Sequence, residues 1–304
     1  MSVMLRTQFP DIFGSLLAAI DAVYIQSRDL DESKAPWKKI FAIKSSDRQF
    51  ENITGFSGFP KFTSVGEAEE VPLIAVAQLF DKKFTHTKFA SAWQVSEEME
   101  DDDQYELVAS FARAFARSYR FTKEVDMSNV LNNMTTTETS ADGSSVGATH
   151  TLYNGSTFAN NVATDFGVSA AQTMYNYFTT LTDDQGIRIH LRPKYIVGAP
   201  NMKWVIGETL RSEYKPFNNT NEINVLNEET LQEIYWPEVT DTDAWYVFTD
   251  PSDLNGLGLR AYNRQEFTVS TDFDVRNLTM LSVGRGRWSR GVVDWRQAYV
   301  STGA

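Results

Sequence analysis

The chain has 304 residues, no cysteine and a net charge of −12, and 42% of its residues are apolar. Its length is sufficient for two or three cooperating subdomains or for one large α/β domain with a sizeable core. The lack of cysteine excludes disulfides and thiolate metal sites, and the acidic balance limits any nucleic-acid contact to a local basic patch. The sequence shows neither an apolar run long enough to span a membrane nor a signal-peptide pattern.

The N-terminal third predicts two extended segments. Residues 1–55 are expected to form an irregular arm with one helix that starts near Pro10, and residues 55–96 a long hairpin. A two-stranded arm with no helix to pack on exposes both sheet edges, so we expect residues 59–95 to lie on a neighbouring subunit. The charged residues expected in this contact, with the acidic tip near basic groups of the neighbour, are Glu67, Glu69, Glu70, Lys82 and Lys83.

A long helix from Asp101 to about Asn133 is the clearest single element. Its apolar residues recur at helical spacing: Leu107, Val108, Phe111, Ala112, Phe115 and Tyr119. Arg113, Arg117 and Arg120 fall roughly opposite this apolar side, at about 100° per residue. Two interpretations of this basic stripe stay open: contact with DNA phosphates without reading of sequence, or ion pairs with carboxylates of the same or an adjacent subunit.

The remaining sequence predicts a mixture of helices and strands. Residues 134–164 are polar and predict a loop with at most short strands, and helices are expected at about 168–181 and 201–211. The second helix follows a predicted strand at 187–197 and precedes an Asn-rich loop at 216–227. Further strands are expected at 231–236, 244–249, 258–263 and 267–271, followed by two long C-terminal strands. The glycines of the segment 284–291 are interpreted as bulges that let a long strand bend.

No pattern typical of catalysis, of a cofactor or of a metal site is present. His86 and His190 lie in strand-like patterns and His150 in a polar loop, so each is interpreted as structural. The acidic run 101–103 lacks the alternating ligands of a calcium loop, which favours helix capping. Glycine-rich segments at 55–59 and 284–291 fit neither a nucleophile elbow nor a phosphate-binding loop. We therefore expect a protein that is not an enzyme and that has no cofactor.

The order of the motifs resembles a tailed-phage major capsid protein of the Hong Kong 97 type, within the group that includes Mu-like major head subunits. The matching segments are WQVSEEMEDDD at 93–103 before the long helix, Asp142-Gly143 with Thr149-His150, and LRPKYIVGAPNMKWVIGETLRS at 191–212, together with the strand-rich C-terminus. No Lys–Asn pair with a catalytic Glu can be matched, so covalent cross-linking of subunits is not expected. The chain has only a short N-terminal arm, which suggests a separate scaffolding protein or a chain that has been processed, and the initial Met1 favours the first.

The resemblance implies an α+β phage capsid fold in which the long helix is the spine of the P-domain. The implied divisions are an N-terminal arm (1–55), an E-loop hairpin (56–96), a P-domain (97–164), an A-domain (165–265) and returning P-domain strands (266–304). It also implies that the loop 216–227 lines the capsomer centre, whereas its sequence alone fits a mobile surface loop equally well. The loop residues concerned are Asn218, Asn219, Asn221 and Asn224.

The function implied is a structural subunit that assembles, as pentamers and hexamers, into an icosahedral shell around double-stranded DNA. The expected partners are copies of itself, packaged DNA held by non-specific contacts, and scaffolding, portal and possibly decoration proteins, with no membrane. The expected location is the virion, after assembly in the host cytoplasm. Two alternatives are kept: an encapsulin-like cargo compartment, and, from a different class, a mixed α/β enzyme or carbohydrate-binding protein.

Overall fold

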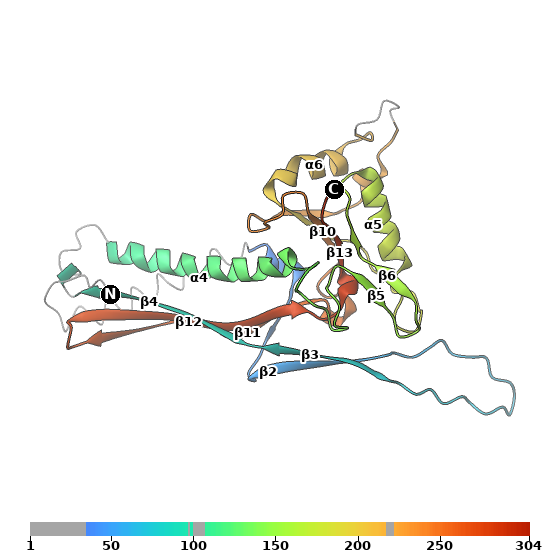
Figure 1. The fold of residues 1–304 in the computed structure, drawn as a ribbon, viewed down its shortest axis with the longest axis horizontal. Helices are drawn as coiled ribbons and strands as arrows, with labels where there is room; N and C mark the ends of the chain where they lie inside the picture. Colours follow the sequence, from blue (N-terminus) through green and yellow to red (C-terminus); the bar gives the residue numbers. More distant parts are fainter. Residues whose placement is uncertain (1–34, 97, 100–106, 217–221) are drawn as a thin grey trace.

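The structure is a computed structural model, and it describes residues 35–96, 98–99, 107–216 and 222–304. These residues form a four-stranded sheet, a five-stranded sheet and two two-stranded ribbons. In Figure 1 long strands and one long helix extend to one side, a compact unit lies at the other end, and a hairpin projects beyond that unit. The helix expected near Pro10 and the acidic run 101–103 lie outside the described residues.

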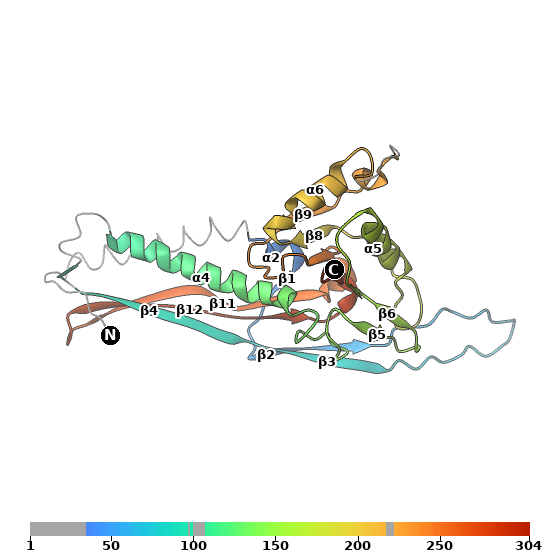
Figure 2. The same cartoon turned by 45° about the horizontal axis from the view of Figure 1, so that its top comes forward.

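The long side of the molecule is a four-stranded sheet with helix α4 (Leu107–Asn132) lying along one face (Figure 2). The helix contains neither Gly nor Pro and is rich in Ala, which favours a continuous helix of 26 residues. Ala112 and Ala116 are buried, so the helix packs close to the strands. In sheet order the strands are β1 (Ala42–Ser45), β11 (Leu259–Asp274), β12 (Thr279–Val292) and β4 (Thr87–Ser96).

Two glycines of β12 make the close approach of α4 possible. A Cβ at Gly284 would overlap Phe115 and lie 2.9 Å from Phe267, and a Cβ at Gly286 would overlap Tyr119. The interpretation of these glycines as bulges is wrong, because the extra residues in the ladder lie in β11 and not in β12. The glycines instead leave room for aromatic rings between the helix and the sheet.

The compact unit is built on a five-stranded sheet with helices α5 (Val168–Thr180) and α6 (Lys203–Arg211) on one face. The central strand β10 (Trp245–Phe248) is buried on both faces. Trp245 and Val247 face α5 and α6, whereas the alternating residues Tyr246 and Phe248 belong to a different core. The other strands are β7 (Asn161–Val162), β13 (Ala298–Ser301), β8 (Tyr195–Gly198) and β9 (Gln232–Tyr235).

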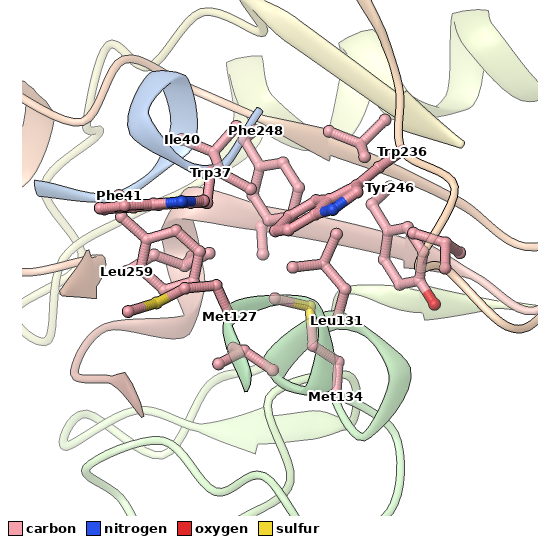
Figure 3. Close-up of a cluster of buried hydrophobic side chains, with 14 of the residues drawn as sticks. Trp37, Ile40, Phe41, Met127, Leu131, Met134, Trp236, Tyr246, Phe248 and Leu259 are labelled. Atoms are coloured by element: carbon pink, nitrogen blue, oxygen red, sulfur yellow. The ribbon is translucent and has the colours of Figure 1, made fainter. Parts of the chain in front are cut away.

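That second core joins the compact unit to the end of the long helix (Figure 3). It combines Trp37 and Ile40 of α2 (Trp37–Ile40) with Met127 and Leu131 of α4, all of them almost completely buried. Side chains of this size stabilise a fold by roughly 1.5–3 kcal/mol each when fully buried. Further members of the cluster are Phe41, Met134, Trp236, Tyr246, Phe248 and Leu259.

Several strand predictions differ from the structure. The strands expected at 258–263 and 267–271 are one bulged strand, β11, and the strand expected at 187–197 is limited to β8. The C-terminus is one long strand and one short strand in different sheets, because the short helix η4 (Trp295–Gln297) interrupts it. Asp294 caps this turn by accepting a hydrogen bond from the Arg296 N–H at 2.9 Å.

Short elements complete the described chain. The polar stretch 134–164 contains the ribbon of β5 (Thr149–Thr151) and β6 (Thr157–Ala159), as expected for short strands. The remaining 3-10 turns are η1 (Pro200–Met202), η2 (Val225–Glu228) and η3 (Asp253–Gly256).

Candidate assembly surfaces

The hairpin carries many exposed side chains. Strands β2 (Phe50–Phe56) and β3 (Gln78–Thr85) pair antiparallel, and the ladder closes where the Ser57 N–H donates to the Ala77 carbonyl at 2.9 Å. Residues 58–76 continue beyond this point and project away from the rest of the fold (Figures 1 and 2). They carry large apolar side chains that the described chain leaves in solvent, among them Phe62 at 92% and Leu73 at 99% exposure.

The predicted acidic residues are at the turn of this hairpin. Glu67, Glu69 and Glu70 are all exposed, and the Gly66 N–H donates to the Glu69 carboxylate at 2.7 Å. Ala68 has a φ of 61°, the left-handed conformation of a tight turn. The turn therefore displays its carboxylates outward.

The base of the hairpin is bound to its own chain. The Lys82 ammonium donates to the Thr139 carbonyl at 2.7 Å, and its burial lowers its pKa despite the opposing effect of Glu138 and Asp142. Lys83 is exposed and lies 4.1 Å from the Phe50 ring centroid. Of the five hairpin residues predicted to contact a neighbour, Lys82 is thus already engaged within the subunit.

An ion-pair cluster next to Lys82 links β12 to α4 and to the loop that follows the helix. Arg290 of β12 pairs with Glu138 at 2.9 Å and with Asp126 of α4 at 3.3 Å. Asp126 also accepts a hydrogen bond from the Trp288 indole at 2.8 Å. Burial raises the pKa of Glu138, although Arg290 and Lys82 oppose this. Glu138 is close enough to Lys82 at the hairpin base for each charge to affect the pKa of the other group.

His86 lies at the junction between β3 and β4 and is only 4% exposed. Ser46 donates its hydroxyl proton to Glu51 at 2.7 Å, so its oxygen accepts from His86 Nε2, 3.1 Å away. Nδ1 of the neutral ring then accepts from Ser289 at 2.9 Å. Burial lowers the pKa of His86, and the charge of Arg287 acts in the same direction.

His150 joins the loop 134–164 to the C-terminal segment. Its Nδ1 lies 2.6 Å from the Asp142 carboxylate and its Nε2 3.1 Å from the Val146 carbonyl. The fully buried ring stacks on Trp295 at 4.2 Å. Burial alone would raise the pKa of Asp142, but hydrogen bonds from His150 and Ser140 outweigh it and lower the value. His190, in contrast, is exposed.

The basic stripe is only partly as expected. Arg113 and Arg117 are exposed on α4, away from buried Ala112 and Ala116, whereas Arg120 is half-buried. Two of the three guanidiniums are therefore displayed on the helix surface. Phe121, which follows them, is 54% exposed.

Asn224 of the Asn-rich loop is buried within its own subunit. Its side chain is 2% exposed and donates to the carbonyls of Thr209 at 2.7 Å and Ser212 at 3.0 Å. The Asn224 side chain is therefore used within its own subunit, where its amide hydrogen-bonds the carbonyls at the end of α6. Asn218, Asn219 and Asn221 lie outside the described residues.

The sequence analysis missed exposed apolar residues in the same unit. Trp204 on α6 is 72% exposed, and Ile223 and Val225 flank the buried Asn224 at 72% and 67%. Helical spacing places Trp204 on the side of α6 opposite Ile206 and Leu210, so its exposure could have been predicted from the sequence. The loop gave no corresponding signal, because the exposed Ile223 and Val225 are apolar and the buried Asn224 is polar.

Within the described residues, no group of three or more His, Asp or Glu side chains is placed to hold a metal ion. Nor is any helix there long and apolar enough to cross a membrane. The arrangement offers contact surfaces, and the buried polar side chains described above hydrogen-bond to groups of their own chain.

Comparison with known proteins gives a family match over most of the chain. A family described as phage capsid protein matches residues 80–301. No curated protein sequence matches significantly. The family segment includes the five-stranded sheet, the strands β4, β11 and β12 of the four-stranded sheet, α4 and the helices of the compact unit.

Solved capsid structures share the fold at low sequence identity. The capsid of cyanophage P-SCSP1u is 9% identical, and the match covers 88% of both chains with a TM-score of 0.57. The capsid of an empty GTA particle is 12% identical over 88% of this chain and 89% of the other, with a TM-score of 0.55. A chain of Mycobacterium phage Patience is 9% identical over 94% and 88%, with a TM-score of 0.55. The fold is thus the α+β fold of Hong Kong 97-type capsid proteins.

Proposed function

Because the chain belongs to the phage capsid protein family and is a structural component of the virion shell, we propose that it self-assembles into a closed icosahedral shell around double-stranded DNA. Pentamers and hexamers of the chain are the building blocks, and assembly takes place in the host cytoplasm with scaffolding and portal proteins. The subunit has a structural role without catalysis. The division into arm, hairpin, P-domain and A-domain is part of the same proposal, with β4 counted among the P-domain strands and β13 in the A-domain sheet.

The observation that carries this proposal is the hairpin. Residues 58–76 expose Phe59, Phe62, Val71 and Leu73, each more than half accessible in the isolated subunit. Burial of apolar area stabilises association by roughly 25 cal/mol per Å², so such a segment gains most from a second surface. Covering by a neighbouring subunit in a closed ring accounts for it.

The test replaces residues 58–76 with an Asn-Gly turn. Ser57 and Ala77 already close the ladder, so a two-residue turn fits the strand ends without disturbing the subunit. We expect a folded subunit, measured by circular dichroism, that forms no closed particles in negative-stain microscopy and light scattering. Normal shells from this variant would contradict the proposal.

The loop 216–227 is proposed to lie at the capsomer centre. Exposed Ile223 and Val225 give the described part of this loop apolar surface for neighbouring copies. Amide exchange of this segment should be slower in shells than in isolated subunits. Equal amide exchange rates in shells and in isolated subunits would contradict the proposal that the loop lies at the capsomer centre.

A further inference from the structure

The hairpin and the four-stranded sheet meet at a joint that the chain crosses twice. Strand β3 pairs with β2 in the ribbon and β4 pairs with β12 in the sheet, so the single residue between them, His86, is where the chain passes from ribbon to sheet. Residues 46–49 are the other crossing, because they connect β1 of the sheet to β2. Both crossings lie at the base of the hairpin (Figures 1 and 2). The angle between hairpin and sheet is therefore set at these residues, which we call the joint.

His86 connects the two crossings and the sheet by directional hydrogen bonds. Its Nε2 donates to Ser46 Oγ on the other crossing, 3.1 Å away, and its Nδ1 accepts from Ser289 of β12 at 2.9 Å. Ser46 in turn donates to Glu51 of β2 at 2.7 Å. The donors thus point in one direction, from Ser289 through the ring to the Glu51 carboxylate. This arrangement requires a neutral imidazole.

An apolar cluster beside the joint allows the angle to change. Phe84 packs on Tyr262 at a ring-centroid distance of 5.3 Å, and both belong to a small cluster with Val293. Tyr262 also lies edge-on to the His86 ring, at 6.3 Å. Apolar burial is not directional, whereas hydrogen bonds weaken steeply when their angles change. Rotation of the hairpin about the joint therefore costs the His86 hydrogen bonds but can keep the apolar contact.

The charges around the joint disfavour a protonated ring. Arg287 of β12 donates its Nε–H to the His86 carbonyl at 3.4 Å. Arg264 of β11 is also close, and its ion-pair partner Asp47, at 3.3 Å, is exposed. Burial lowers the pKa of His86, the charges of Arg287 and Arg264 act in the same direction, and Glu51 opposes them. Two guanidiniums and one nearby carboxylate thus surround a ring that is buried in its neutral form.

We propose that His86 is a pH-sensitive latch that fixes the angle of the hairpin at neutral pH and releases it when the ring is protonated. The proton on Nδ1 takes the place of the one that Ser289 donates, so the hydrogen bond to β12 is lost. The new charge is repelled by Arg287, and the ring gains hydration by moving away from the sheet. The latch acts within a single subunit, so it goes beyond the proposed assembly and does not depend on it.

The test measures the position of the hairpin in isolated subunits, where the lack of cysteine allows two spin labels to be attached. Gln78→Cys carries a label at the far end of β3 and Ser169→Cys a label on α5, both at exposed positions. Position 78 is eight residues from His86, about 27 Å along a strand, so a rotation of about 10° moves the label by roughly 5 Å. Pulsed electron paramagnetic resonance gives the distance between the labels at pH 7.5 and at pH 5.0.

We expect the distance in the labelled parent to change by at least about 5 Å between the two pH values. His86→Gln keeps an uncharged donor and acceptor at the joint, so its distance should be the same at both pH values. His86→Ala lacks both hydrogen bonds and should show the acidic distance already at pH 7.5. His190→Gln is the matched control, because His190 is exposed, and it should behave like the parent.

Three results would overturn the inference. An unchanged distance in the parent, with folded subunits by circular dichroism, would show that protonation does not move the hairpin. A change that persists in His86→Gln would assign the pH response to other groups. Loss of the folded state of the parent at pH 5.0 would assign it to the whole subunit. Failure of the chain to form shells would contradict the proposed function and would leave these distances unaffected.

Discussion

At the scale of single residues, buried polar side chains hold together segments that are far apart in sequence. His150 is fully buried between Asp142, the Val146 carbonyl and the Trp295 ring. Replacing it with Ala removes two hydrogen bonds and leaves a cavity beside the indole. We expect His150→Ala to lower the free energy of unfolding by about 2–4 kcal/mol.

Urea unfolding of isolated subunits measures this effect. His190 is the matched control because its ring is exposed, and His190→Ala should change the free energy of unfolding by less than about 0.5 kcal/mol. Similar losses for both variants would show that the His150 contacts contribute little.

His86 gives the subunit a pH dependence. Its folded-state pKa lies below the usual 6.5, chiefly through burial and then through Arg287, with Glu51 opposing. A lowered histidine pKa means that the unfolded chain binds more protons, so this contribution is complete above pH 6.5 and decreases as the pH falls below it. We expect unfolding free energy to decrease between pH 7.5 and 5.5, and the difference between the parent and His86→Gln to shrink over that range. A difference independent of pH would contradict this assignment.

At the scale of elements, the long helix depends on glycines in the strand beneath it. Gly284→Ala places a Cβ against Phe115 and Phe267, and overpacking of this kind costs about 1–3 kcal/mol. The control is Gly207→Ala in α6, where a Cβ meets no atom within 4 Å and helix propensity favours Ala by about 0.8–1.0 kcal/mol. Thermal unfolding of the two variants should therefore shift in opposite directions.

Elements with a strong periodic pattern were predictable from the sequence, and elements set by tertiary contacts were not. The helix ending near Asn133 and the helix at 168–181 follow local apolar spacing, and both are present as α4 and α5. The sheet to which the last strand belongs was not predictable from the sequence. β13 pairs with β10 and β7 because Asp294 and η4 turn the chain before it. The role of the β12 glycines was not predictable for the same reason, because it depends on the aromatic rings of α4 that pack against them and not on the local sequence.

The candidate contact residues also divide into those whose exposure is set by local sequence and those whose exposure is set by tertiary contacts. Exposure of Glu67, Glu69 and Glu70 could be predicted from a charged turn, because local sequence decides it. Asn224 could not be distinguished from its Asn neighbours, because its burial depends on the free carbonyls at the end of α6. Lys82 likewise looks exposed in an alternating strand, but the loop containing Thr139 folds over it.

At the scale of the whole molecule, basic groups are displayed on two faces of an acidic subunit with a net charge of −12. Lys88 and Arg285 are exposed on the open face of the four-stranded sheet, and α4 covers the other face with Arg113 and Arg117 on its outer side. If the outer side of α4 faces the shell interior, these two guanidiniums meet DNA phosphates, and counterion release makes the contact dependent on salt. Pairing with carboxylates of an adjacent subunit is the alternative, and it predicts an assembly defect instead.

The corresponding prediction uses Arg113→Gln with Arg117→Gln in filled particles. Empty-shell assembly should be unchanged, whereas DNA should be released at lower temperature, with a salt dependence weaker by a slope of about one per lost phosphate contact. Arg188→Gln with Arg192→Gln is the matched control, since both arginines are exposed outside α4. Arg120 is changed separately, because its half-buried side chain belongs to the helix packing and its loss should lower subunit stability. If the Arg113→Gln, Arg117→Gln variant fails to assemble without DNA, the two arginines form an assembly contact. If it assembles and retains DNA like the control, they are only part of a solvated surface.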